Sequence, residues 1–401
     1  MKPSRRAILV MNAGSSSLKL ALIDPNTEES LLTALLENLN TPRSAVTIKP
    51  EGCEKVVQTI PDLSHRTGFD AAIGLVQEHL DWSPDLVAVG HRVVHGGPYF
   101  SASSLVTDEV IEKIEECRDL APLHNPWALE GIRAVHERFP NLPQIAVFDT
   151  AFHQTMPPAA YLYAIPHDLH EDHKIRRYGF HGTSFHYLTE EAARLLGKPR
   201  GETNLLLAHL GNGCSAAAVR NGRGVDTTMG ITPLEGLVMG TRSGDIDPSL
   251  FLFLKQLKGF SVEESTEMLN QRSGLLGLSG KSNDMREITA GMRGGDPACQ
   301  TAFDVFCHRL ARALFGLASS LDHIDALVFS GGIGENTPIV RQRVAERFAL
   351  LGMRLDPERN AIHGDPATRR ITRDDSPVPA LVIPTNEELM IARDTIALIN
   401  T

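Results

Sequence analysis

The sequence is poor in cysteine and has no long apolar run. Its five cysteines form no C-x-x-C pair: Cys53, Cys117, Cys214, Cys299 and Cys307. An odd cysteine count without a secretory signal favours reduced thiols and a cytoplasmic location. No stretch approaches the roughly 18 consecutive apolar residues of a membrane-spanning helix. We therefore expect no membrane partner.

An excess of positive charge is also missing. Lys and Arg number 39 against 49 Asp and Glu, which gives a formal net charge of −10. Nucleic acids and anionic membranes bind basic surfaces, so we expect neither as a partner. At 401 residues and 42% hydrophobic composition, the chain is too long for one compact core. It is typical of a soluble enzyme with two domains.

Several common catalytic motifs are absent from the sequence. It contains no G-x-S-x-G, H-E-x-x-H or G-x-G-x-x-G. Gly280-Lys281-Ser282 resembles the end of a P-loop, but the leading glycine that this motif requires falls on Leu275, one residue after Gly274. Serine hydrolases, zinc hydrolases and P-loop enzymes therefore have little support.

The most informative segment present is Gly236-Leu-Val-Met-Gly-Thr-Arg-Ser-Gly-Asp-Ile-Asp-Pro248. It places Arg242, Asp245 and Asp247 among glycines that allow a close approach of backbone to a ligand. Neither a helix nor a strand is written this way, which predicts a loop at a site. An arginine presented there suits a carboxylate or a phosphoryl group. The alternative is that Arg242 pairs with its own aspartate neighbours.

The chain shows two weak internal repeats. Residues 7–23 and 204–219 share a strand–turn–strand pattern, and residues 86–97 and 326–336 each read as a buried strand that ends in glycines. These repeats predict a duplicated domain. Helices are expected between and after the strands, at Asp108–Asp119 capped by Thr107, Asn125–Phe139 capped by Asn125, Pro297–Leu321, and from Thr337 or Pro338 to Phe348. The pattern predicts an α/β fold that binds ligands at turns after strands, in a cleft between the halves.

Polar residues follow three predicted strands. The first turn carries Asn12 and three serines with Lys19 beyond it, and the others are 209–213 and 331–336. Backbone N–H groups and short hydroxyls in such turns cradle phosphate, although plain β-turns use the same residues. Three such turns favour a nucleotide site.

Single titratable residues mark further candidates. His124 and His181 lie in turns bounded by proline or glycine and are the better candidates. The roles of His153, His186 and His209 stay undecided at this point. Asp149 follows the predicted strand Gln144–Phe148, as a metal ligand or catalytic residue would, or as a helix cap. After the predicted strand Ala380–Ile383, Thr385 and Glu388 form a possible capping box, and Glu387 is alternatively a ligand of a metal or its water.

Taken together, these segments resemble the acetate kinase family. Nine segments match its pattern in order: residues 12–19, 90–97, 122–126, 148–153, 177–184, 209–213, 233–248, 331–336 and 385–389. The resemblance implies the duplicated actin/Hsp70/sugar-kinase (ribonuclease H-like) fold, with domains at 1–150 plus 386–401 and at 151–385. The first domain would carry acetate and phosphoryl contacts, and the second would bind nucleotide. The resemblance also implies a homodimer.

The same resemblance assigns roles to individual residues. Catalysis would involve Arg92, His124, Asp149, His181 and Arg242, and the acetate pocket Arg92, Val94, Leu123, Phe180 and Pro233. ATP or ADP would contact Lys19, His209, Leu210, Gly211, Asn212, Gly213, Asp284, Met285, Arg286, Gly332, Ile333, Gly334, Glu335 and Asn336. Asn12, Asp149 and Glu387 would organise Mg²⁺, which Mn²⁺ would replace. One departure is visible, since Phe185 stands where the family usually has histidine.

The expected reaction is the reversible transfer of the ATP γ-phosphoryl group to acetate, and it is chemically coherent. A carboxylate acceptor is already ionised at neutral pH and needs no general base. Two alternatives remain open: a propionate or butyrate kinase on the same fold, and a nucleotide-switched binding protein of the actin/Hsp70 kind. The second leaves paired Arg92 and Arg242 unexplained.

Overall fold

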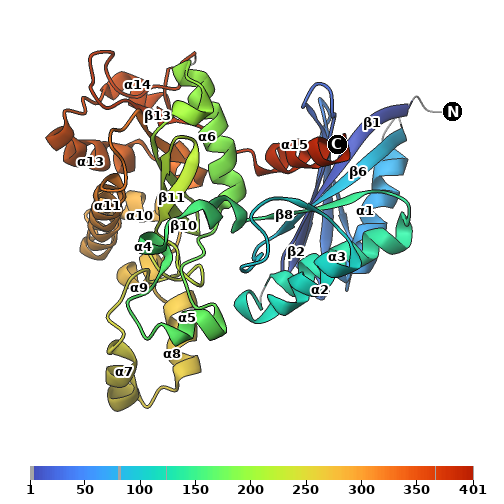
Figure 1. Cartoon of the computed structure of the whole chain (residues 1–401), viewed down its shortest axis with the longest axis horizontal. Helices are drawn as coiled ribbons and strands as arrows, with labels where there is room; N and C mark the ends of the chain where they lie inside the picture. Colours follow the sequence, from blue (N-terminus) through green and yellow to red (C-terminus); the bar gives the residue numbers. More distant parts are fainter. Residues whose placement is uncertain (1–3, 80–82, 123, 366, 401) are drawn as a thin grey trace. The chain divides into compact units, whose positions relative to one another are not determined.

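The structure, a computed structural model, describes residues 4–79, 83–122, 124–365 and 367–400. Contacts divide the chain into two compact units, Met1–Gln154 with Asn386–Thr401 and Thr155–Thr385. Each unit is built on its own sheet (Figure 1). All five cysteines are free. Among the described helices, none has the length and apolar character needed to cross a membrane.

The first unit contains an eight-stranded sheet in the order β5-β4-β3-β2-β1-β6-β8-β7. Its strands are β1 (Ser4–Ala13), β2 (Ser17–Ile23), β3 (Ser30–Glu37), β4 (Ala45–Pro50), β5 (Val56–Thr59), β6 (Ser83–Val93), β7 (Ser104–Leu105) and β8 (Gln144–Phe148). Its helices are α1 (His65–His79), α2 (Asp108–Glu116), α3 (Asn125–Arg138) and α15 (Glu387–Ile399). Strands β1, β6 and β8 are parallel, so their carboxyl ends lie at one edge of the sheet.

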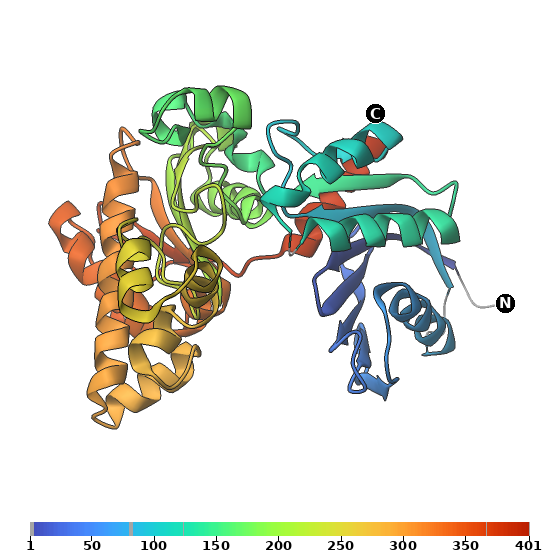
Figure 2. The same cartoon turned by 90° about the horizontal axis from the view of Figure 1, so that it is seen from below.

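Two helices cover opposite faces of this sheet. A Cβ built on Gly131 of α3 would lie 3.6 Å from Met11 of β1. One built on Gly90 of β6 would lie 2.4 Å from Thr395 Oγ1 of α15. In the views of Figures 1 and 2, the strands lie between α3 and the red helix α15. The strand β6 therefore uses a glycine where α15 comes closest.

The second unit contains a five-stranded sheet in the order β11-β10-β9-β12-β13. Its strands are β9 (Leu205–Leu210), β10 (Cys214–Arg220), β11 (Arg223–Thr227), β12 (Ala326–Ser330) and β13 (Ala380–Val382). The helices are α4 (Pro158–Tyr161), α5 (Asp168–His173), α6 (Gly182–Leu196), α7 (Leu250–Lys258), α8 (Val262–Gln271), α9 (Gly274–Ser279), α10 (Met285–Arg293), α11 (Pro297–Ala318), α12 (Gly331–Asn336), α13 (Pro338–Phe348) and α14 (Pro357–Ala361). Helix α6 packs on β9 and β12, and α11 packs on β9 and β10.

The two sheets share one strand arrangement, which confirms the predicted duplication. The order β3-β2-β1-β6-β8 in the first unit matches β11-β10-β9-β12-β13 in the second. In each series the first three strands are antiparallel to their neighbours, and the last two are parallel to the third. The repeats found in the sequence correspond to β1–β2 with β9–β10 and to β6 with β12. Strands β3, β4, β5 and β7 were not predicted.

Most predicted helix starts are correct, but the predicted cap at Asn125 is wrong. Thr107 caps α2 through its side chain, which accepts from Val110 N, although α2 ends at Glu116 and not at Asp119. Asn125 does not cap α3, because the N-cap is His124. The Asn125 side chain is fully buried and instead accepts from His95 N (3.1 Å) and donates to His95 O (2.9 Å). It therefore fixes the segment that follows β6.

Further along, the helix predicted from Pro297 ends at Ala318, before Leu321, and α13 begins at Pro338 after the N-cap Thr337. The predicted glycine turn at 331–336 is a short helix, α12. The capping box at Thr385 is wrong, because Asn386 is the N-cap of α15 and its side chain accepts from Leu389 N at 3.0 Å. This cap leaves Glu387 in the first turn of α15.

The close contact at Gly90 leads to a stability prediction. Gly90→Ala should destabilise the protein by roughly 1–3 kcal/mol, because the added methyl overlaps Thr395 and Ile391 of α15. The measurement is the midpoint of chemical denaturation. Gly74→Ala in α1 is the control, since nothing lies within 4 Å of its built Cβ, and it should be neutral or stabilising. Equal midpoints for Gly90→Ala and wild type would contradict the packing.

Candidate active site

In the first unit, three predicted site residues lie where parallel strands end. Asn12 is near the end of β1, Arg92 near the end of β6, and Asp149 directly follows β8. The ladders β1–β6 and β6–β8 run in register up to these positions. Lys19 is paired with Asn12 across the β1–β2 ladder. This edge is where open α/β sheets bind ligands.

Arg92 and Asp149 form a bidentate ion pair. Arg92 Nε donates to both Asp149 carboxylate oxygens at 3.1 Å, and its NH2 group donates to Oδ2 at 2.6 Å. Asp149 is only 1% exposed. The NH1 group of Arg92 lies 3.9 Å from Glu387 Oε2 at the start of α15. The last helix of the chain thus brings a second carboxylate to the same guanidinium.

Asp149 and Glu387 share the guanidinium of Arg92, and the pKa values of Arg92 and Glu387 are shifted. Burial alone would lower the pKa of Arg92, but the charges of Asp149 and Glu387 raise it above its ordinary value. Burial raises the pKa of Glu387, and the charge of Arg92 offsets this rise only in part. A further cation beside Glu387 would favour its ionised form.

The remaining predicted residues of this unit and of the acetate pocket comprise three of this unit, near the end of β6 and the start of α3, and two of the second unit. Val94 is half-buried just beyond β6, and His124 is the N-cap of α3. Leu123 lies outside the described residues. The other two predicted pocket residues, buried Phe180 and half-buried Pro233, belong to the second unit. The predicted acetate pocket therefore draws on both units, and its assembly stays a prediction.

In the second unit, the turn after β9 is the meeting point of three predicted residues. A Cβ built on Gly213 would lie 3.4 Å from His181 Nε2 and 3.6 Å from Arg242 NH1. The His181 ring stacks on His209, with 4.4 Å between ring centroids. A side chain at position 213 would therefore press on both the imidazole and the guanidinium. His181 itself adopts φ 57° at the start of α6, a left-handed conformation that is uncommon for a histidine.

The loop prediction for residues 236–248 is confirmed, since they form no helix or strand. Arg242 NH1 donates to Pro233 O at 3.2 Å, and within the described part of the chain Arg242 forms no ion pair with Asp245 or Asp247. Asp245 accepts from Gly236 N instead. Burial lowers the pKa of Arg242. The alternative of a self-paired loop is therefore wrong, and the half-buried guanidinium suits an anionic ligand.

A pocket of about 420 Å³ lies beside this turn. Its lining is Gly211, Asn212, Asn283, Asp284, Met285, Arg286, Gly332, Ile333, Asn336 and Thr337. All of these except Asn283 and Thr337 were predicted nucleotide contacts. Asn283 Nδ2 donates to Asn212 Oδ1 at 3.0 Å, which joins two walls of the pocket.

Other predicted nucleotide residues lie elsewhere. Lys19 belongs to the first unit. Leu210 is 0% exposed, so its side chain packs in the core, and Gly334 is buried within α12. Glu335 folds back to accept from Gly331 N at 2.9 Å. Leu210, Gly334 and Glu335 therefore do not line the pocket.

A series of hydrogen bonds that was not predicted from the sequence joins the ends of three strands in this unit. Ser184 Oγ lies 2.9 Å from His209 Nδ1 and 2.8 Å from Thr385 Oγ1. Glu335 Oε1 accepts from Thr385 N at 3.3 Å as well as from Gly331 N. The ends of β9, β12 and β13 are thereby tied together.

A second unpredicted network supports the segment that precedes Arg242. Arg177 NH1 donates to the carbonyl oxygens of Thr227 and Thr228 at 2.8 Å, and NH2 donates to Glu235 Oε1 at 2.5 Å. The other Glu235 oxygen accepts from Tyr163 OH at 2.5 Å. These contacts hold the backbone around Pro233, which accepts from Arg242.

Comparison with known proteins identifies the family. A model of the acetokinase family matches residues 7–393. The chain belongs to the acetokinase family.

Relatives and solved structures agree with this assignment. The chain is 50% identical to the acetate kinase of Chromobacterium violaceum over 97% of each chain. It is 49% identical to acetate kinase 1 of Neisseria meningitidis over 98% of each. A propionate kinase structure from Francisella tularensis has a TM-score of 0.92 at 47% identity and covers 98% of this chain and 99% of its own. The acetate kinase structure from Porphyromonas gingivalis has a TM-score of 0.93 at 38% identity over 98% and 100%.

The departure from the usual acetokinase pattern lies in the core. Phe185 is 0% exposed and belongs to α6, which packs on β9 and β12. Its side chain is therefore buried within the second unit.

The ionisation of Glu387 leads to a pH prediction. Because burial raises its pKa in the folded state, the folded chain binds its proton more tightly than the unfolded chain, and stability is lost as pH rises through that pKa. Glu387→Gln removes this penalty. The variant should gain denaturation midpoint over wild type at pH 7, and the gain should shrink as the pH falls to 4.

Glu267→Gln on the exposed face of α8 serves as the control. A gain that is constant from pH 4 to pH 7, or a lower midpoint for Glu387→Gln at pH 7, would contradict the prediction.

Proposed function

We propose that this chain catalyses the reversible transfer of the ATP γ-phosphoryl group to acetate, which gives acetyl phosphate and ADP. Membership of the acetokinase family supports a carboxyl group as the acceptor. The observation that carries the proposal is the half-buried Arg242 guanidinium, which lacks a carboxylate partner among the described residues and converges with His181 on Gly213. Such a guanidinium is suited to a carboxylate or a transferring phosphoryl group.

The side chains perform positioning and charge stabilisation in this mechanism. An acetate ion is already a nucleophile at neutral pH, so no residue has to remove a proton from it. Asp149 is therefore better suited to orientation than to base catalysis, and its oxygens already accept from Arg92. We assign to Arg242 and His181 the stabilisation of charge on the transferring group. Arg92 is assigned the acetate carboxylate, as the family resemblance implies.

The first unit supplies the oxygen donors that Mg²⁺ prefers. Asn12, Asp149 and Glu387 offer amide and carboxylate oxygens. Burial raises the pKa of Glu387, so a further positive charge would stabilise its ionised form. These residues would hold Mg²⁺, or Mn²⁺ in its place. The ion would neutralise charge on the phosphate oxygens. The pocket lined by Asn212, Asn283 and the start of α12 would hold ATP or ADP.

Propionate is the second candidate acceptor. The propionate kinase of Francisella tularensis is 47% identical to this chain, a higher identity than the 38% of the acetate kinase from Porphyromonas gingivalis. One added methylene changes binding by only about 1–3 kcal/mol. The two activities are therefore expected to overlap, with butyrate a poorer acceptor still.

Trapping of acyl phosphate by hydroxylamine tests the proposal. The protein is incubated with ATP, Mg²⁺ and acetate, propionate or butyrate, and the hydroxamate is measured. We expect the largest kcat/KM with acetate. A higher value with propionate would move the assignment to propionate kinase. Release of ADP without hydroxamate from any acid would instead support a nucleotide-switched protein of the actin/Hsp70 kind.

Two further expectations belong to the same proposal. The family resemblance implies a homodimer, which light scattering of the purified protein would test. We also propose a cytoplasmic enzyme whose partners are acetate, acetyl phosphate, ATP and ADP. A monomer that is fully active at assay concentration would remove the homodimer from the proposal.

Loss of the Arg242 guanidinium should affect turnover directly. Arg242→Ala should lower kcat by roughly 10³-fold, because arginines at phosphoryl-transfer sites stabilise the transition state. Steady-state kinetics with both substrates is the measurement. Arg293→Ala, at the exposed end of α10, is the control. A change confined to KM would show that Arg242 binds only the ground state.

Asp149→Asn should lose Mg²⁺-dependent turnover. The amide keeps the size of the side chain but removes the charge that Arg92 and a metal ion share. Activity is titrated against Mg²⁺ concentration, with Asp304→Asn on the exposed face of α11 as the control. Near-normal activity of Asp149→Asn at ordinary Mg²⁺ would rule this role out.

A further inference from the structure

Arg341, on α13, is the largest fully buried side chain among the described residues. A guanidinium that is 0% exposed must satisfy its donors inside the protein. No carboxylate pairs with Arg341 within the described ranges, and burial lowers its pKa to about 10. It therefore remains protonated at neutral pH, as a buried charge held by neutral acceptors alone. Such a group is costly, so the contacts it makes must be specific.

The acceptors of Arg341 lie on α12 and on α14 with the turn that follows it, where NH2 lies 3.3 Å from His363 Nδ1. NH1 donates to the carbonyl oxygens of Gly334 and Glu335 in α12, at 2.7 and 2.8 Å. Nε donates to Asn360 Oδ1 at 2.8 Å, and NH2 donates to Asn360 O at 2.7 Å, both in α14. The last carbonyls of a helix lack intrahelical partners and favour a positive charge. Arg341 therefore completes the carboxyl end of α12 and joins it to α14.

Helix α12 carries one wall of the proposed nucleotide pocket. Gly332, Ile333 and Asn336 line that pocket. The amino end of α12 is fixed by Glu335, whose side chain accepts from Gly331 N and Thr385 N. At the carboxyl end, Arg341 provides the corresponding contacts. With six residues, α12 is too short to hold its shape alone.

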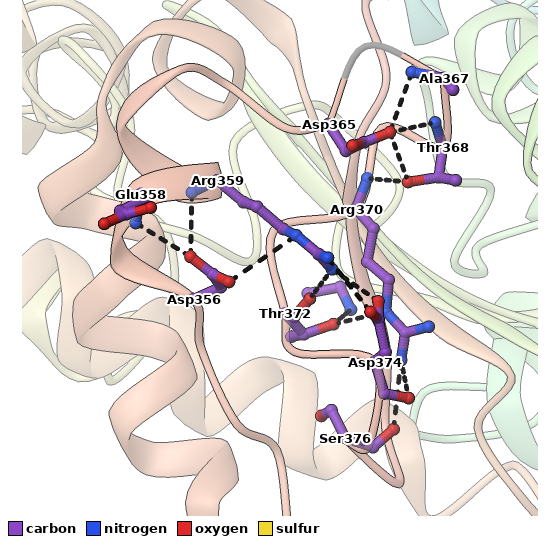
Figure 3. A network of polar contacts seen from close by, with 11 residues as sticks. Asp356, Glu358, Arg359, Asp365, Ala367, Thr368, Arg370, Thr372, Asp374 and Ser376 are labelled. Atoms are coloured by element: carbon purple, nitrogen blue, oxygen red, sulfur yellow. Dashed lines mark hydrogen bonds and ion pairs between the residues drawn. The ribbon is translucent and has the colours of Figure 1, made fainter.

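Helix α14, which Arg341 joins to α12, is itself held by hydrogen bonds. Asp356 caps α14 by accepting from Glu358 N and Arg359 N, at 3.0 and 3.1 Å. Arg359 donates to Thr372 O at 3.0 Å and to Asp374 Oδ1 at 2.7 Å (Figure 3). Asn360 also donates to Pro338 O at the start of α13. These contacts hold Asn360 in place, so that Arg341 joins α12 to an ordered element.

We propose that Arg341 is a positioning residue that holds α12 in the shape required for nucleotide binding, without touching the nucleotide. This inference rests on the proposed function, because it takes the pocket at α12 as the ATP site. It makes nucleotide affinity depend on a side chain that is inaccessible to any ligand.

The test compares Arg341→Met and Arg341→Lys with wild type. Methionine fills similar space without donors, and lysine keeps the charge but cannot reach both helices as the planar guanidinium does. Hydrogen–deuterium exchange of residues 331–337 is measured in the free protein, the Kd of ADP by calorimetry, and KM for each substrate by kinetics. Arg343→Met, on the same helix but half-exposed, is the matched control.

We expect faster exchange at 331–337 in both Arg341 variants and a rise of about 10-fold or more in the Kd of ADP and the KM of ATP. The KM of acetate should stay within about 2-fold of wild type, and Arg343→Met should behave as wild type. A role in stability alone would lower the active fraction and leave the KM of ATP unchanged, which would overturn the proposal. If Arg341→Met does not fold, Arg341→Lys gives the same comparison.

Failure of the proposed function gives a different result. Wild type would then neither bind ADP nor form acyl phosphate, and the positioning role would fall with it. Unchanged exchange at 331–337 in Arg341→Lys, with wild type still binding ADP, would overturn only the role of Arg341.

Discussion

Parallel pairing of three strands in each unit determines where the chemistry of this chain lies. Strands β1, β6 and β8 end together, and so do β9, β12 and β13. Backbone groups beyond these ends have no ladder partner, so loops and helix starts with polar side chains follow them. In the first unit this register places Asn12, Arg92 and Asp149, and α15 places Glu387. In the second unit the same edge carries the turn at Gly213 and the start of α12.

The duplicated framework carries different chemistry at its two edges. In the first unit the edge is charged, with Arg92 between the carboxylates of Asp149 and Glu387. In the second, the edge is tied by hydroxyl, imidazole and backbone groups around Ser184, His209 and Thr385. A charged edge suits a metal ion and a small anion, whereas an edge rich in backbone donors suits phosphates. One strand arrangement thus carries a different set of polar groups in each unit.

The sequence predicted those parts of the fold that local rules decide. Thr107 and Pro338 mark helix starts because caps and N-terminal prolines act over a few residues. The alternation of apolar strands and polar turns was sufficient to find the duplication. The four-residue strand β5 lies at the edge of the sheet, where it is half-buried or exposed and gives no alternating pattern. Likewise, 331–336 reads as a turn by its glycines, and the contacts of Glu335 and Arg341 that support its helical form are not visible in the sequence.

Among the site residues, the family resemblance identified most of the pocket lining, but neither it nor the sequence pattern identified the residues that hold the lining in place. Asn212, Asp284 and Gly332 stand in segments typical of ligand contacts. Arg341 sits in a helix whose pattern gives no sign that this arginine is buried, since burial depends on α14 meeting α13. Arg177 and Glu235 are far apart in sequence, and only tertiary structure pairs them. Arg92 and Arg242 belong to different units, and their action on one reaction centre remains a prediction.

The placement of α15 has a consequence for biosynthesis. The helix that covers Gly90 and supplies Glu387 follows the whole of the second unit in chain order. The ribosome therefore synthesises the whole second unit before α15 is available to cover one face of the first unit's sheet. Until α15 is made, the first unit exposes apolar strands, and Glu387 is missing beside Arg92 and Asp149. A chain that stops before α15 would lack both the cover of this sheet face and Glu387. We expect cellular proteases to degrade such a chain.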